Sequence, residues 1–259
     1  MNENPAPPAN EPPPIRDSSL FSRLTDVFVT PGSVFEELRT AKPNHANWLV
    51  PLLLACVIGV VASWVMLSQE NIMRSVREAQ QQQMQKQVDA GKMTREQADK
   101  ALEVAEQFMN PGMMKIFGAI GSMFASTAML FVVALVLWLL GTKVFHGEFG
   151  FMRAVEASGL ASMINVVAGV VTTLLVVIKG RLMVSLGPAL FIRDLDMNNP
   201  AHRALAAISI LTLWYVGVLS IALARLSGGS VTKAAGWLYG IWAAVSFGGI
   251  AIGFAVSPR

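Results

Sequence analysis

Residues 116–140 read IFGAIGSMFASTAMLFVVALVLWLL and contain no Asp, Glu, Lys, Arg or His over 25 positions. A helix rises about 1.5 Å per residue, so roughly 20 apolar residues cross a hydrocarbon core about 30 Å thick. Inside hydrocarbon the backbone must satisfy its own hydrogen bonds, which a helix does. The run therefore predicts a transmembrane helix.

Four more runs without charged residues or histidine have 20 to 24 residues each, at 48–67, 157–178, 204–224 and 234–257. All 20 Lys and Arg, all 17 Asp and Glu and all three His lie outside the five runs. We therefore expect an all-α polytopic membrane bundle with five transmembrane helices, formed by residues 48–257.

The overall composition agrees with a membrane protein and argues against other classes. Of the 259 residues, 53% are hydrophobic and 14% are charged, whereas a soluble domain has about 25% charged residues. Such a chain is too apolar for a disordered protein or an ordinary soluble enzyme. The net charge of +3 is too small to indicate a nucleic-acid partner, and we expect the lipid bilayer as the main contact.

The segment before the first span has two parts. Six prolines in the first 14 residues predict a disordered Pro-rich tail over 1–17. Residues 18–47 predict two short amphipathic helices, with Glu36 and Glu37 on the wet face of the second. Such helices lie in the membrane interface or pack against the bundle's own surface, and the pattern allows both.

The connection 68–115 is long and polar, and it predicts an extramembrane helical hairpin with its turn near residues 89–92. Thr94 and Gln97 have the spacing of a capping box at the start of the second helix. The hairpin could dock a protein partner, mediate self-association or close on itself.

Chemistry-bearing patterns are missing from the sequence. No Asp, Glu, Lys, Arg or His lies in a predicted span, although pumps and proton-coupled carriers usually need such a residue. No metal-ligand spacing, phosphate-binding loop or nucleophile motif is present. We therefore expect a non-enzymatic protein with no catalytic residues, metal or cofactor. The notable polar intramembrane residues are Asn165 and Tyr215, and we expect Asn165 to hydrogen-bond a neighbouring helix.

Small residues recur at helical spacing in two spans. Such stripes let helix backbones approach closely, which is a main route to helix association in lipid. We predict helix packing within the bundle or, alternatively, between two copies of the chain. The predicted packing positions are Gly236, Gly240, Ala244 and Gly248 in the last span, and Gly118, Ser122 and Ser126 in the second.

Several stretches in order resemble a known family. They are Pro31 with Phe35, the turn LGTKVFHGEFGF at 140–151, Asn199-Pro200 and LTLWY at 211–215. The chain resembles the Ypt/Rab-interacting protein (YIP) family of five-span membrane proteins, in particular its bacterial branch. Gly159 stands at the glycine of the family's G-Y-x-x-x-P motif, whose Tyr and Pro positions hold Leu160 and Ile164.

The resemblance implies a non-enzymatic protein of the bacterial inner membrane with a cytoplasmic N-terminus, since eukaryotic members bind Rab-type GTPases in vesicle traffic. The charge bias leans the other way: eight Lys and Arg lie on the N-terminal side and twelve opposite, and cytoplasmic loops are usually the richer ones. Our leading hypothesis is an adaptor or membrane organiser that acts by association. The alternative is a passive channel or a small-solute or lipid transporter.

Overall fold

The computed structural model describes residues 18–108, 110–180, 184–193, 195–196 and 199–256. The predicted tail, residues 1–17, lies outside this set. The elements are helical throughout the described part, in the order α1 (Leu20–Asp26), α2 (Pro31–Thr40), α3 (Ala46–Leu67), α4 (Glu70–Asp89), α5 (Arg95–Phe108), α6 (Pro111–Leu139), the π-helix η1 (Leu140–Val144), α7 (Phe151–Ala161), α8 (Met163–Lys179), the 3-10 helix η2 (Pro188–Phe191), α9 (Pro200–Ala207), α10 (Ile210–Ser227) and α11 (Val231–Val256).

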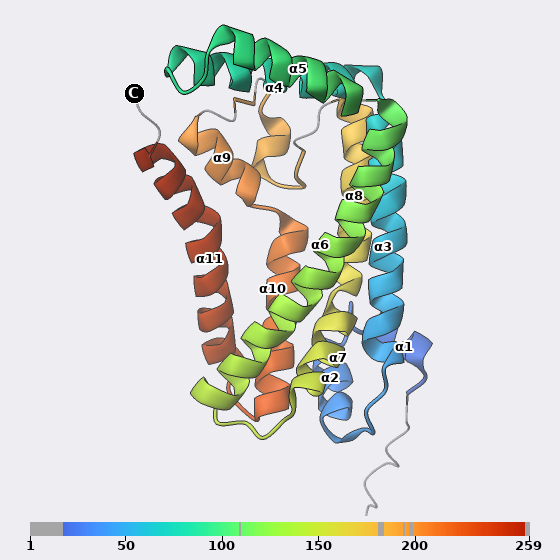
Figure 1. Cartoon of the computed structure of the whole chain (residues 1–259). Coiled ribbons are helices and arrows are strands. Elements are labelled where there is room, and N and C mark those ends of the chain that lie inside the picture. Colours follow the sequence, from blue (N-terminus) through green and yellow to red (C-terminus); the bar gives the residue numbers. More distant parts are fainter. Residues whose placement is uncertain (1–17, 109, 181–183, 194, 197–198, 257–259) are drawn as a thin grey trace, which may run out of the picture.

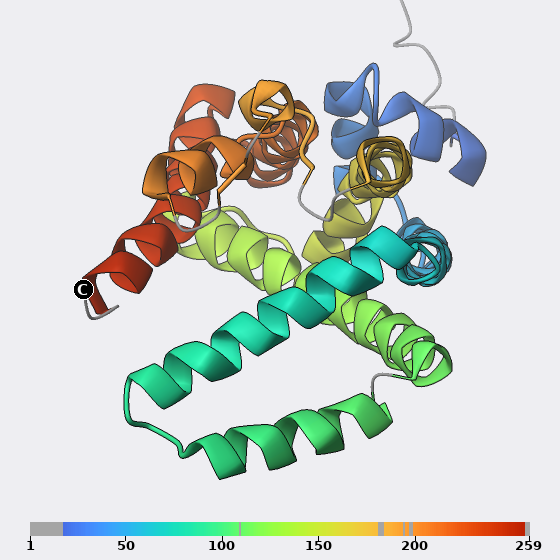
Figure 2. The ribbon, with the colours of Figure 1, turned by 90° about the horizontal axis from the view of Figure 1, so that it is seen from above.

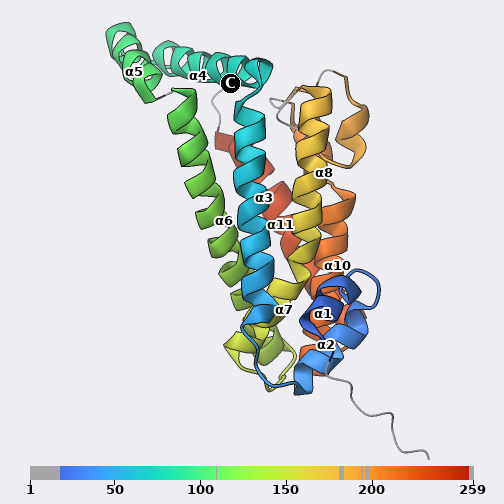
Figure 3. The same cartoon turned by 90° about the vertical axis from the view of Figure 1, so that its right-hand side faces the viewer.

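Five stretches of the described chain are long and apolar enough to cross a membrane, which confirms the predicted fold class. They are α3, α6 with η1, α7 with α8, α10 and α11. The helices stand side by side, with α1 and α2 at one end of the bundle and the α4–α5 pair lying across the other (Figure 1). Figure 3 shows the same arrangement from the side.

The third span is made of two helices, α7 and α8, which meet at Ser162. Its first part, α7, is buried without interruption from Ala154 to Ala161. Gly159 explains how α7 fits so tightly: a Cβ there would lie only 2.3 Å from Cα of Trp48, in the first turn of α3. The absence of a side chain at Gly159 therefore lets the two backbones touch.

The fourth span begins later than predicted. The expected run 204–224 is interrupted, because α9 ends at Ala207 and both Ile208 and Ser209 are extended before α10 begins. The loop before η2 packs against this break: Ile210 N donates to the Leu186 carbonyl at 2.9 Å, and a Cβ on Gly187 would lie 2.0 Å from the Ile208 carbonyl. Composition could not reveal the break, since these residues are uncharged.

The main core lies at the end of the bundle that carries α1 and α2. Phe35 and Leu38 of α2 are fully buried with residues of α7 and α10. Val27, just after α1, joins the same cluster. The apolar face of α2 thus packs against the bundle itself, which was one of the two alternatives for the amphipathic segment.

Candidate functional site

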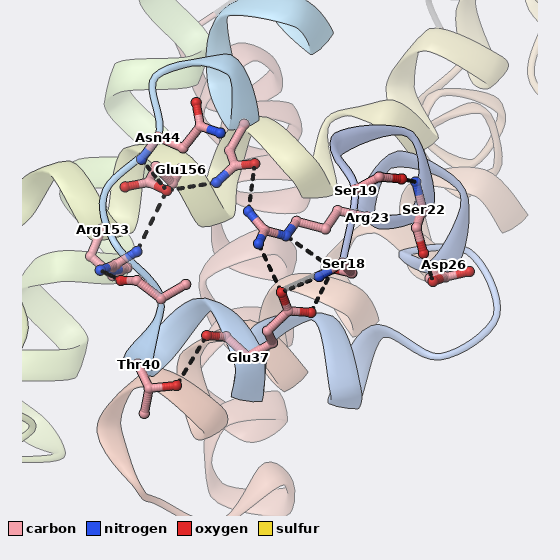
Figure 4. Close-up of polar contacts among 12 residues, drawn as sticks. Ser18, Ser19, Ser22, Arg23, Asp26, Glu37, Thr40, Asn44, Arg153 and Glu156 are labelled. Atoms are coloured by element: carbon pink, nitrogen blue, oxygen red, sulfur yellow. Dashed lines mark hydrogen bonds and ion pairs between the residues drawn. The ribbon is translucent and has the colours of Figure 1, made fainter. Parts of the chain in front are cut away.

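A buried polar network joins the N-terminal helices to two spans (Figure 4). Its first half links α1 to α2. Arg23 Nη2 donates to Glu37 Oε1 at 2.7 Å, and Ser18 donates to both carboxylate oxygens, from its hydroxyl at 2.5 Å and its backbone N–H at 3.0 Å. Arg23 Nε also donates to the Ser18 hydroxyl at 3.1 Å. The Glu37 carboxylate is therefore held by three donors.

The second half reaches the spans through Asn47, which is completely buried in the first turn of α3. Its side-chain Oδ1 accepts from Arg23 Nη1 at 3.4 Å, and its Nδ2 donates to Glu156 Oε2 at 2.7 Å. Glu156, on α7, is only 2% exposed. Arg153 Nη1 lies 3.5 Å from the same oxygen, and Arg153 Nη2 donates to the Ala41 carbonyl at 2.6 Å.

The network contains two arginines and two glutamates, so its formal charges cancel. A buried charge destabilises the fold unless it is paired and hydrogen-bonded. Removing one partner therefore leaves the other charge buried and unpaired, which is strongly destabilising. The pairing therefore fixes α1, α2, α3 and α7 in one arrangement. Burial raises the pKa of the Glu37 carboxyl, but hydrogen bonds from Ser18 and Arg23 and the Arg23 charge outweigh it, so the pKa lies below its ordinary value.

The expectation that Glu37 lies on a wet face was wrong, whereas Glu36 is indeed about half exposed. Glu37 flanks the apolar face of Val34 and Leu38 on the helical wheel, which lets it reach Arg23 while α2 is packed. Arg23 has the same position beside the apolar face of α1. Charged residues at the edges of two neighbouring apolar faces were the sequence signal for this pair.

The two polar intramembrane residues lie together. The Asn165 side chain on α8 lies beside the Tyr215 side chain on α10. Tyr239 of α11 donates to the Leu213 carbonyl at 2.7 Å, and the Thr173 hydroxyl donates to the Gly169 carbonyl within α8. These polar groups thus serve contacts between and within spans.

The small-residue stripe of α6 packs inside the chain. A Cβ on Gly118 would lie 3.3 Å from Cβ of Ser63 on α3, and one on Gly59 of α3 would lie 2.9 Å from the Ser122 hydroxyl. Ser126, one turn further along α6, is half-buried. Gly118 and Ser122 therefore let α3 and α6 approach closely.

The stripe of α11 has a different environment. A Cβ on Gly236, Gly240 or Gly248 would meet no atom of the described chain within 4 Å. Gly236, Gly240 and Ala244 instead line a groove of about 840 Å³ beside Val144 and the turn between α10 and α11. No other helix of the described chain covers this face.

The described residues hold no cluster of three or more His, Cys, Asp or Glu that could bind a metal ion. Most polar groups of the site are hydrogen-bonded to one another, although the buried Arg153 Nη1 has no hydrogen-bond partner among the described residues. Their arrangement is suited to holding helices together and to presenting surfaces.

The sequence pattern of the Yip1 domain matches residues 25–252 of the chain. No curated protein and no solved structure matches the chain. The match begins inside α1 and continues into α11, so it includes all five spans and the network residues Glu37, Asn47, Arg153 and Glu156, whereas Ser18 and Arg23 precede it. The protein is a multi-pass integral membrane protein, and it belongs to the Yip1 domain family.

Proposed function

We propose that the protein acts without catalysis, as a membrane-organising adaptor of the trafficking type that binds another protein through its α4–α5 hairpin. The observation that carries this proposal is the hairpin's exposure. From Glu70 to Val104, only Ile72, Met73 and Ala98 are buried among the described residues. Seen from above, α5 lies outside the group of spans (Figure 2).

The root of the hairpin is firmly attached. Ile72 is fully buried against Val176 and Val184, and Asn71 Nδ2 donates to the Gly180 carbonyl at 2.8 Å. Gly180 has a φ of +64°, and a Cβ there would lie 2.6 Å from Asn71 Nδ2. A fixed root with an exposed arm is the geometry of a presented binding surface.

The arm itself retains an apolar stripe that is only partly covered. Val76, Met84 and Val88 on α4 and Leu102 on α5 are half-buried. The second helix begins with the expected capping box, in which Thr94 and Gln97 exchange hydrogen bonds of 2.9 and 3.2 Å. Amphipathic helices bind partners through such stripes.

Photo-crosslinking at single positions in cell membranes tests the proposal. Crosslinkers at Arg77 and Glu103, both exposed on the hairpin, are expected to give discrete protein adducts. A crosslinker at Phe124, which is 75% exposed on α6, is the control for lipid-facing surface. Adducts that are lost when Val76, Met84 and Val88 are replaced by serine support the proposal, and identical patterns at all three crosslinker positions contradict it.

We also propose, from the family resemblance, that the end carrying α1 is cytoplasmic and that the membrane is a bacterial inner membrane. Because α1 and α4 lie at opposite ends of the bundle (Figure 1), single cysteines at Ser18, just before α1, and at Gln82, on α4, report the orientation in a Cys56→Ala background. Labelling of Gln82→Cys but not Ser18→Cys by an impermeant thiol reagent in intact cells supports this orientation. The transporter alternative is tested separately, by flux of ions, solutes or labelled lipids into proteoliposomes.

A further inference from the structure

We propose that the groove along α11 binds one anionic phospholipid from the leaflet on the α1–α2 side. The inference is independent of the hairpin's proposed role. The groove lies at the start of α11, beside the turn that joins α10 to α11, and its lining includes Lys233, Gly236, Gly240 and Ala244. These four residues follow one face of the helix.

The length of the groove matches one leaflet. Lys233 and Ala244 are 11 residues apart on α11, which corresponds to about 16 Å along a helix axis. Half of a hydrocarbon core about 30 Å thick is about 15 Å. An acyl chain that enters beside Lys233 would therefore run along the glycine face to about the middle of the membrane.

The two ends of the groove differ in polarity, as a lipid does. Ser230 and Lys233 supply the polar groups at the end nearest the turn. Phe145 lies at this same end against Gly229, and beyond it the wall is apolar, with Trp237 and Ile241 beside the small residues. Aromatic rings are typical of the membrane interface, and basic pockets between spans bind anionic headgroups.

Charge complementarity selects an anionic headgroup. No carboxylate of the described residues lines the groove, and neither Lys233 nor Lys143, next to the lining residue Val144, forms an ion pair within the described chain. The acidic residue nearest to Lys143 in sequence is Glu148, in the loop before α7. The groove's end wall is packed, because a Cβ on Gly229 would lie 2.6 Å from the Phe145 ring.

Native mass spectrometry of the purified full-length chain tests the proposal, with phosphatidylglycerol and phosphatidylcholine as probes. We expect phosphatidylglycerol to be retained preferentially. Lys233→Gln should weaken its binding about five-fold, the value of one lysine at a membrane surface. Lys179→Gln, at the far end of α8, is the matched control and should leave binding unchanged.

Gly240→Leu fills the groove and should abolish retention of both lipids. A Cβ at Gly240 meets no atom of the described chain within 4 Å, so the new side chain begins in open space. Gly121→Leu, whose Cβ also meets nothing within 4 Å, is the control on α6. The proposal is overturned if Lys233→Gln and Lys179→Gln bind phosphatidylglycerol equally. It is also overturned if Gly240→Leu converts a dimer to a monomer without changing lipid retention, because the groove would then hold a second copy.

Discussion

Gly159→Ala should destabilise the protein far more than its size suggests. The new Cβ would lie 2.3 Å from Cα of Trp48 and 2.8 Å from the Asn47 carbonyl, whereas ordinary contact begins at 3.4 Å. The helices α7 and α3 must therefore separate by about 1.1 Å, the difference between those distances. Backbone atoms cannot rotate away as a flexible side chain can.

The separation also acts on the polar network, because Glu156 lies on α7 and Asn47 on α3. Their hydrogen bond of 2.7 Å would lengthen to about 3.8 Å, beyond hydrogen-bonding range. Overpacking costs about 1–3 kcal/mol, and an unsatisfied buried polar group costs about 1–3 kcal/mol. The expected loss is therefore about 2–6 kcal/mol, or roughly 4–24 °C in Tm.

Thermal unfolding in detergent micelles, followed by tryptophan fluorescence, measures this loss. Gly121→Ala and Gly236→Ala are matched controls, since a Cβ at either position meets nothing within 4 Å. In an Asn47→Leu background, Gly159→Ala should cost less, because the hydrogen bond is already gone. If Gly159→Ala unfolds at the same temperature as the controls, the close approach of α7 to α3 is refuted.

Three further predictions concern other contacts. The pKa of the Glu37 carboxyl is lowered in the folded state. Its contribution to stability is therefore full above the ordinary pKa of about 4.3 and is lost as pH falls through the lowered folded pKa. Unfolding midpoints measured between neutral pH and pH 3 should fall less steeply in Glu37→Gln than in the unchanged protein. Tyr239→Phe removes the hydrogen bond to the Leu213 carbonyl and should lower the free energy of unfolding by about 1 kcal/mol in the same assay. Trp214→Phe changes packing alone, so its loss of stability is expected to be of a different size. Ser63→Cys with Gly118→Cys in a Cys56→Ala background should form a disulfide on mild oxidation, because the two Cβ positions lie 3.3 Å apart, near the usual range of about 3.5–4.5 Å; equal crosslinking of Ser63→Cys with Gly121→Cys would contradict the α3–α6 packing.

Length and hydropathy were enough to predict the spans, because a bilayer demands long uncharged helices. Because the spans are uncharged throughout, hydropathy does not reveal where a helix is interrupted within a span. Ile208 and Ser209 leave the helix in response to the loop at Gly187, a contact more than 20 residues away in sequence. The third span likewise divides at Ser162 into α7 and α8, although its sequence is uncharged on both sides of this residue.

The polar network was harder to predict, because its members lie on four elements and pair only after packing. Glu156 stands directly before the predicted run 157–178, yet it is buried beside Asn47 and the loop at Asn44. The small-residue stripes of α6 and α11 were also only partly predictable from the sequence. Identical spacing predicted helix packing for α6 and α11, but only the position of α3 determines that Gly118 is covered and Gly240 is open.

The break at Ile208 leaves α10 with 18 residues, or about 27 Å, whereas the 22 residues of α3 give about 33 Å. A short span in contact with lipid would thin the surrounding bilayer. In α10, however, 44% of the apolar stretch is buried, against 17% in α3. The mismatched helix is thus shielded by its neighbours, and the hydrophobic thickness that this protein requires of a membrane is set by α3 and α6.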